Sequence, residues 1–201
     1  MEPKSFSAAS ERNREPILGV LRTHFADRRH VLEIGSGTGQ HAAYFAAQLP
    51  HITWHASDRA ANLPGIRQWL DEAALPNTPA PLVLDVARGP WPRQAFDAVF
   101  SANTLHIMAW PEVEAMFTGL DAVVARDAKL AIYGPFNYRS RYTSTSNAEF
   151  DRSLKAQDAQ RGIRDFSDVD RLAHAAGFVL IEDAAMPANN RCLVWQRREV
   201  T

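Results

Sequence analysis

Short apolar runs alternate along this chain with stretches in which apolar residues recur every three or four positions. In the stretch 111–125, Val113, Met116, Phe117, Leu120 and Val124 repeat at helical spacing. This alternation is typical of βα units on a mostly parallel sheet, so we expect an α/β fold. The expected strands are 30–34, 52–57, 81–86, 96–101, 129–133, 178–183 and 192–196, and the expected helices are 40–49, 63–75, 111–125 and 167–176.

The two ends of the pattern add detail. Pro16 suits the first turn of an N-terminal helix, since its missing N–H would be unpaired there anyway; Ile17, Leu18, Leu21 and Phe25 would form the buried face of that helix. The connection 186–191 is too short for a helical crossover, so the last two strands are expected to pair antiparallel. The segment 136–165 lacks apolar periodicity and follows the fifth strand.

Composition narrows the class of protein. With 201 residues and 46% hydrophobic residues, the chain can bury one core, so we expect a single domain 1–201, with an N-terminal helical cap at 1–29 and an insertion or lid at 136–165. Twenty-two basic and 23 acidic side chains leave a charge of −1, which gives no general attraction to nucleic acid or to an anionic membrane. No apolar run approaches the roughly 20 residues of a membrane span, and a secretory signal pattern is lacking, so a cytoplasmic protein is expected. The lone Cys192 agrees with that compartment and is expected in the core.

The most informative stretch is the expected strand 30–34 with the glycine-rich turn that follows it. Gly35, Gly37 and Gly39 allow left-handed backbone angles and close approach of a ligand to the main chain, the next helix offers free N–H groups, and Ser36 within the turn is a further predicted cofactor-binding residue. A dinucleotide turn, G-x-G-x-x-G, would need glycine at position 40, which is Gln40. Glu33 would repel a diphosphate but attract an ammonium group. Together these features favour S-adenosylmethionine, which carries an amino group and a sulfonium and no phosphate.

Two further carboxylates end the next strands. Asp58 stands at the end of the second strand and can accept bonds from the two hydroxyls of a ribose. Asp85 lies at the end of the third strand, beside Val86, where it can accept from an adenine amino group while the Val86 backbone N–H meets a ring nitrogen. Each residue also has a structural interpretation, Asp58 as a helix N-cap and Asp85 as a turn residue. Their succession at carboxyl ends of strands favours the ligand site.

At this point the chain resembles the class I, seven-stranded, Rossmann-like methyltransferase fold over nearly its whole length, which implies the strand order 3-2-1-4-5-7-6 with strand 7 antiparallel. More closely, it resembles the methyltransferase-like protein 26 family; it departs from that pattern at Gly35 and at Arg139-Ser140. The second departure leaves the shape of the segment after Phe136 open. The motifs that carry the closer resemblance are 11–18 (ERNREPIL), 36–41 (SGTGQH), 134–136 (GPF), 143–147 (TSTSN), 150–151 (FD) and 162–165 (GIRD).

The resemblance implies where the reactive methyl group lies. The exit of the fourth strand would lie beside it, so Asn103 and His106 are the candidate catalytic residues, with Asn103 also touching the cofactor. A histidine with a pKa near neutrality would accept the proton of a hydroxyl, thiol or amine acceptor. The alternative for His106 is a core histidine packed under the following helix.

The acceptor pocket is expected under the insertion. Arg12 and Asn13 of the N-terminal segment would close over the cofactor, with Arg12 or Arg14 pairing with the methionine carboxylate, and the alternative for both arginines is helix-surface charge. The mixture of basic and aromatic residues at 138–143 is also compatible with an RNA contact, but the acidic residues that follow favour a lid or solvated face. The proposed substrate-binding residues are Phe136, Asn137, Tyr138, Tyr142 and Asn147.

The sequence therefore predicts an S-adenosylmethionine-dependent methyltransferase that releases S-adenosylhomocysteine and acts on a small molecule through an oxygen, nitrogen or sulfur nucleophile. No metal site is expected, because His51 and His55 flank a strand without a cysteine cluster. Two rivals remain: a non-catalytic cofactor-binding module that acts through a protein partner, and a nucleotide-dependent oxidoreductase, against which Glu33 and Gln40 argue.

Overall fold

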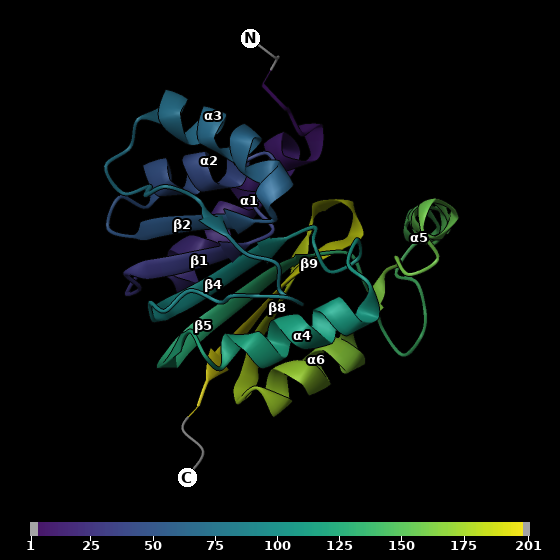
Figure 1. The fold of residues 1–201 in the computed structure, drawn as a ribbon. Helices are drawn as coiled ribbons and strands as arrows, with labels where there is room; N and C mark the ends of the chain where they lie inside the picture. Colours follow the sequence, from purple (N-terminus) through teal and green to yellow (C-terminus); the bar gives the residue numbers. More distant parts are fainter. Residues whose placement is uncertain (1–3, 199–201) are drawn as a thin grey trace.

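The computed structural model describes residues 4–198. A seven-stranded sheet in the order β3-β2-β1-β4-β5-β9-β8 forms the middle layer (Figure 1). Strands β1 to β5 run parallel, whereas β9 pairs antiparallel with both β5 and β8. Because β8 and β9 are the sixth and seventh strands of this sheet along the chain, the order 3-2-1-4-5-7-6 with an antiparallel seventh strand is confirmed. The strands are β1 (His30–Ile34), β2 (Thr53–Asp58), β3 (Leu82–Val83), β4 (Phe96–Ala102), β5 (Val124–Gly134), β8 (Phe178–Met186) and β9 (Asn190–Arg197).

Helices cover both faces of the sheet (Figure 1). On one face, α1, α2 and α3 bury a cluster that includes Phe45, Trp54 and Phe100; on the other, α4 and α6 bury a cluster that includes Phe117 and Trp195. Each strand of the parallel core is thus apolar on both sides, as a sheet covered by crossover helices requires. The helices are α1 (Ala8–His24), α2 (Gln40–Gln48), α3 (Leu63–Ala73), α4 (Trp110–Leu120) and α6 (Phe166–Ala175), with short 3₁₀ turns at Ala60–Asn62 and Pro187–Asn189. No helix among residues 4–198 is both long and apolar enough to cross a bilayer.

The N-terminal helix begins earlier than the sequence indicates. Ser7 is its N-cap, accepting the Ser10 backbone N–H at 3.1 Å, so Pro16 lies inside the helix rather than in its first turn. Pro16 removes the hydrogen bond that an N–H at this position would donate to the Arg12 carbonyl, and packing of Ile17, Leu18 and Leu21 outweighs that loss. The consequence is that the first turn of α1 reaches the edge of the sheet where β1 ends.

Two boundaries differ from expectation for local reasons. The helix expected at 111–125 ends at Leu120, and β5 starts at Val124, because the β-branched pair Val123-Val124 pairs with the start of β4 through the bond from the Phe96 N–H to the Val123 carbonyl. Strand β3 is only two residues long, so Asp85 and Val86 lie in the turn that follows it rather than in the strand.

The segment 136–165 is ordered as an insertion after β5. It contains α5 (Thr145–Gln157) and a small parallel pair made by β6 (Phe136–Asn137) and β7 (Arg164–Asp165). Buried Asp151 holds it together by accepting the Tyr142 hydroxyl, the Lys155 ammonium and the Ile163 N–H at 2.6–2.7 Å. Figure 1 places α5 to one side of the two-faced sandwich, beyond the N-terminal end of α4.

Candidate functional site

A cavity of about 490 Å³ lies at the carboxyl ends of β1, β2 and β4. This is the edge at which open α/β sheets bind ligands. Of the residues singled out from the sequence, the structure brings seven to its wall: Gly35, Ser36, Gly37, Asp58, Val86, Asn103 and His106.

The glycine turn forms the floor of this cavity. Gly35, Gly37 and Gly39 all have positive φ, at 74°, 57° and 90°. A Cβ at Gly35 would meet the Thr104 side chain at 2.7 Å, and one at Gly39 would meet the Ile66 Cα at 2.9 Å. Gly39 is the N-cap of α2 and contacts α3, and it does not line the cavity, so its glycine is required for packing of the helix rather than for room beside a ligand.

We expect a Gly39→Ala substitution to lower the free energy of unfolding by about 2 kcal/mol, because it combines backbone strain at positive φ with overlap against the α3 backbone. Gly37→Ala is the matched control: its Cβ would meet nothing within 4 Å, so we expect only the cost of the φ angle, about 1 kcal/mol. Urea unfolding of both variants measures the difference, and equal losses would contradict the packing role of Gly39.

Asp58 holds the turn in place. Its Oδ2 accepts the Gly37 N–H at 2.8 Å, while Oδ1 accepts the Arg59 N–H at 2.7 Å and the Asn62 side-chain amide at 2.8 Å. Oδ1 already accepts two hydrogen bonds and Oδ2 accepts one. Asp58 is predicted from the sequence to accept from both hydroxyls of a ribose, but only Oδ2 can take one further hydrogen bond, so it can accept from a single hydroxyl. Asp58 also acts in part as the helix cap that the sequence left open. Its Oδ1 accepts hydrogen bonds from the Arg59 N–H and the Asn62 side-chain amide, which stabilise the turn that leads into α3.

Glu33 lies beneath the turn rather than in the cavity. Its side chain is about 1% exposed and accepts the Trp54 indole N–H at 2.8 Å. Burial raises the pKa of Glu33 to about 7, against the lowering effect of hydrogen bonds from Trp54 and Ser36. Glu33 is predicted from the sequence to contact an ammonium group, but its side chain does not line the cavity. It faces Trp54 in the apolar cluster under α2 and α3 instead.

The raised pKa of Glu33 predicts a pH-dependent cost of folding. The unfolded side chain loses its proton near pH 4.5 and the folded one near pH 7, so the folded state binds the extra proton in between and stability falls as pH rises. Between pH 5 and pH 7 the difference in unfolding free energy between wild type and Glu33→Gln should shift by about 2 kcal/mol against the wild type. The comparison with Glu33→Gln is needed because three histidines, His41, His55 and His106, also make stability depend on pH. Burial lowers their pKa values to about 4, so their contribution to stability rises with pH, equally in both proteins, and cancels in the difference. A constant difference across this range would contradict the buried, protonated state of Glu33.

Asp85 stands beside the cavity but not on its wall. Its Oδ1 accepts the Ala87 N–H at 3.1 Å, an Asx turn, and its Oδ2 lies 3.6 Å from Nε of Arg59. Arg59 does line the cavity and also pairs with Glu112, which caps α4 by accepting the Ala109 N–H. Asp85 therefore has the structural role that the sequence left open, while the wall near β3 is apolar Leu84 and Val86.

Asn103 and His106 lie together where β4 ends. Asn103 has φ +56°, a left-handed conformation that is uncommon outside glycine, and its N–H donates to the Tyr133 carbonyl at 2.9 Å. The His106 imidazole is 6% exposed and packs edge-to-face on Phe150 at 5.3 Å between ring centroids. Burial, and then the charge of Arg164, lower the pKa of His106 to about 4. The predicted near-neutral pKa is therefore wrong, and this imidazole is uncharged at pH 7.

The N-terminal segment closes the cavity with different residues from those predicted. Ser7, Ala9 and Ser10 line it, whereas Arg12 is exposed and Asn13 is buried one turn further along α1. Asn13 reaches the site through His41, whose Nε2 lies 2.7 Å from the Asn13 Oδ1. The Gln40 side chain bonds to the Ser7 backbone, which ties the start of α1 to the glycine turn.

The five predicted substrate-binding residues do not line this cavity, and the side chains of three of them hold the insertion together or tie it to the β8–β9 hairpin. Tyr138 donates to Asp183 at 2.8 Å, Tyr142 to Asp151 at 2.7 Å, and Asn147 to Thr143 and the Asn189 carbonyl. Phe136 is 1% exposed in the core, and Asn137 is partly buried in β6. The insertion contacts the cavity through Phe150 and Arg161 instead. Phe150 belongs to the motif 150–151 that carries the family resemblance, but its place on the cavity wall, like that of Arg161, depends on how α5 docks.

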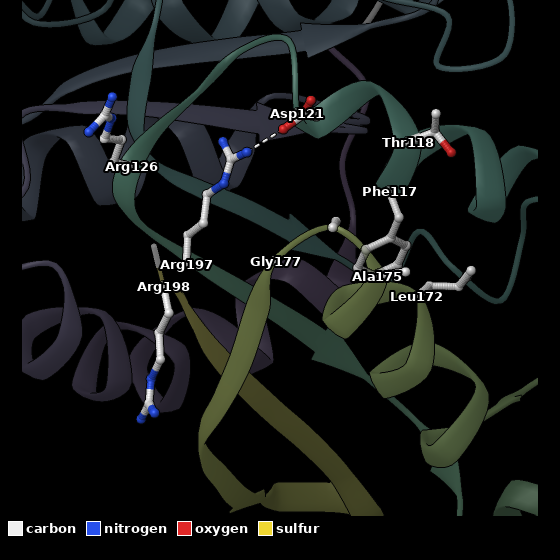
Figure 2. Close-up of a pocket in the computed structure, with 10 residues that line it drawn as sticks. Phe117, Thr118, Asp121, Arg126, Leu172, Ala175, Gly177, Arg197 and Arg198 are labelled. Carbon is white, nitrogen blue, oxygen red and sulfur yellow. Dashed lines mark hydrogen bonds and ion pairs between the residues drawn. The ribbon is translucent and has the colours of Figure 1, made fainter. Parts of the chain in front are cut away.

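A second cavity, of about 690 Å³, lies at the opposite edge of the sheet, between the ends of α4 and α6. Figure 2 shows Arg197 pointing to Asp121 there, and Arg197 also donates to the Val124 carbonyl at 3.1 Å. These bonds join β9 to the end of α4. None of the residues predicted for cofactor or substrate lies in this cavity, so the candidate site is the one at the glycine turn.

Residues 4–197 match one protein-family model along almost their whole extent, that of the protein of unknown function DUF938. The chain belongs to the DUF938 family. The resemblance to the methyltransferase-like protein 26 family is a finer assignment that this match does not make.

Solved structures place the DUF938 chain in the methyltransferase fold. It is similar to the S-adenosylmethionine-dependent methyltransferase SibL (20% identity, TM-score 0.81, covering 96% of this chain and 56% of that one). It is also similar to the mitomycin 7-O-methyltransferase MmcR (16%, 0.82, 94% and 54%) and to an O-methyltransferase family protein from Burkholderia thailandensis (17%, 0.79, 93% and 57%). The DUF938 chain thus spans little more than half the length of each, and at these identities the likeness establishes the fold.

Proposed function

We propose that this protein is an S-adenosylmethionine-dependent methyltransferase that acts on a small-molecule nucleophile. The observation that carries the proposal is the single cavity wall that joins the glycine turn and Asp58 to His106. The first part has the chemistry to hold a nucleoside, and the second offers an uncharged imidazole. The O-methyltransferase neighbours favour an oxygen nucleophile, with nitrogen and sulfur as alternatives.

The residues at the turn fit the cofactor. Gly35 and Gly37 allow close approach to the main chain, Asp58 Oδ2 has room for one hydroxyl, and Leu84 and Val86 offer apolar surface for a flat base. When bound, S-adenosylmethionine supplies a methyl group on a positively charged sulfur. Methyl transfer of this kind needs an aligned nucleophile and a site that excludes water more than it needs a metal.

The residues beyond the turn do the rest. The N-terminal turn of α1 covers the cavity from one side, and Phe150 and Met108 add apolar wall from the other, so both exclude water. Among residues 4–198, His106 contacts Phe150 through its ring, and no hydrogen bond contributes to its pKa. The ring nitrogen that carries no proton is therefore available to take one from the methyl acceptor. Since a histidine with so low a pKa is a weak base, it favours acceptors whose own proton is acidic, such as phenols.

Titration calorimetry with S-adenosylhomocysteine, S-adenosylmethionine and NAD tests the proposal. We expect the first two to bind and NAD not to bind, because Gln40 occupies the position of the third glycine of a dinucleotide turn. Binding of NAD alone would favour an oxidoreductase and overturn the proposal. A metabolite extract incubated with the cofactor then separates an enzyme, which releases S-adenosylhomocysteine, from a binding module, which does not.

The motifs that resemble the methyltransferase-like protein 26 family support the same proposal at a finer level. Three of those motifs supply residues at the site: the glycine turn 36–41, Phe150 of the motif 150–151, and the 162–165 stretch whose Gly162 N–H donates to the His106 carbonyl at 2.9 Å. These contacts bring the motifs together at one site without assigning a substrate.

A further inference from the structure

Arg161 brings a positive charge to the cavity from the insertion. It lines the wall, and the next residue, Gly162, donates its N–H to the His106 carbonyl at 2.9 Å. Arg161 is thereby held next to the histidine that faces the proposed acceptor. The sequence analysis did not single it out.

The guanidinium of Arg161 is only partly paired. Its Nη1 donates to the Gln157 side chain at 3.3 Å, and its Nε forms a long ion pair with Asp158, 3.8 Å from Oδ2 and beyond hydrogen-bond distance. Nε itself is buried and has no hydrogen-bond partner among the described residues. An N–H that is hidden from water and unpaired is costly, so this atom marks a place where an acceptor is missing.

The other arginines near the cavity differ. Arg59 pairs with Glu112 and Asp85, and Arg164 donates to the Leu105 and Gln160 carbonyls at 3.1 and 2.9 Å as well as to the Met108 carbonyl. Both are occupied in holding loops together. Arg161 is the cavity-lining arginine whose Nε–H makes no hydrogen bond among the described residues. If a small turn of the side chain brings that buried edge to the cavity, its Nε–H and an Nη–H match the two oxygens of a carboxylate.

We propose that the methyl acceptor carries a carboxylate, and that Arg161 binds it so that the nucleophile of the same molecule faces His106. This inference rests on the proposed function. It makes Arg161 a specificity-determining residue and names the substrate class as small hydroxy- or amino-substituted acids. Phe150, on the same insertion, provides apolar wall for the body of such a molecule.

Matched pairs of ligands test this in the protein saturated with S-adenosylhomocysteine. The probes are 4-hydroxybenzoate against 4-hydroxybenzamide, and 3-hydroxypropionate against 3-hydroxypropionamide, titrated while the ¹⁵N signal of the Arg161 side chain is followed by NMR. We expect at least one acid to bind about tenfold more tightly than its amide and to shift the Arg161 Nε–H signal. Arg161→Gln should reduce that preference to about twofold or less, while Arg161→Lys should retain part of it.

The control is Arg152→Gln, which removes the same charge from an exposed position of α5 that does not line the cavity and should leave the preference unchanged. Equal affinity for acids and amides, absence of binding by all four probes while S-adenosylhomocysteine binds, or a preference that survives in Arg161→Gln would each overturn the inference. The titrations are repeated without S-adenosylhomocysteine. If that nucleoside does not bind but the Arg161-dependent preference for acids is present, the proposed function fails while the carboxylate site stands.

Discussion

A His106→Ala variant should have a kcat about 10²- to 10³-fold below that of the wild type once an acceptor is found, because it removes the group that we propose accepts the acceptor's proton. S-adenosylhomocysteine affinity should change little, since His106 lies beyond the glycine turn.

The pH dependence of the wild-type rate is a second test of the role of His106. Burial and Arg164 hold the pKa of His106 at about 4, so the imidazole is uncharged from about pH 5 upward and protonated below about pH 4. Titration of His106 should therefore not change the wild-type rate between pH 5 and pH 8, and protonation of His106 should lower the rate in more acidic buffer.

His55→Ala is the matched control for this experiment. His55 is likewise buried, its pKa is likewise lowered to about 4, and it does not line the cavity. We expect it to affect stability and not kcat. A His106→Ala enzyme with unchanged turnover would return His106 to the core role that the sequence left open.

An Asp58→Ala variant should bind S-adenosylhomocysteine about 10²- to 10³-fold more weakly, measured by calorimetry. It removes the carboxylate that we propose accepts a hydrogen bond from a ribose hydroxyl, and it also releases the Gly37 N–H and the Asn62 amide that fix the floor of the cavity. Both effects act on the same ligand, which is why the expected loss exceeds that of one hydrogen bond. The free protein should remain folded, because the substituted side chain lies at the rim of the sheet.

Asp71→Ala controls for the loss of one negative charge. Asp71 is exposed on α3, so affinity should stay within about twofold of the wild type. If Asp58→Ala bound S-adenosylhomocysteine as tightly as Asp71→Ala does, the assignment of the nucleoside to this edge of the sheet would be wrong.

Several features of the fold follow from local pattern. Alternating strand and helix periodicity identified all seven strands of the main sheet, and the short connection before Asn190 gave the antiparallel end. The resemblance added the strand order. Local pattern failed where tertiary contacts compete with it. Pro16 marks a helix start by intrinsic preference, yet the cap at Ser7 and the buried face of α1 extend the helix past it.

For the site, the sequence by itself determined that the glycine turn and Asp58 would meet at one edge of the sheet, because parallel strands in successive βα units end at the same side; the resemblance added His106. Only the tertiary structure decided which side chains face the cavity. It turned Glu33 inward, used Tyr138, Tyr142 and Asn147 to fasten the insertion, and brought Arg161 beside His106. Those outcomes depend on how a helix distant in sequence docks and on which groups it shields from water, and neither is encoded in the spacing of neighbouring residues.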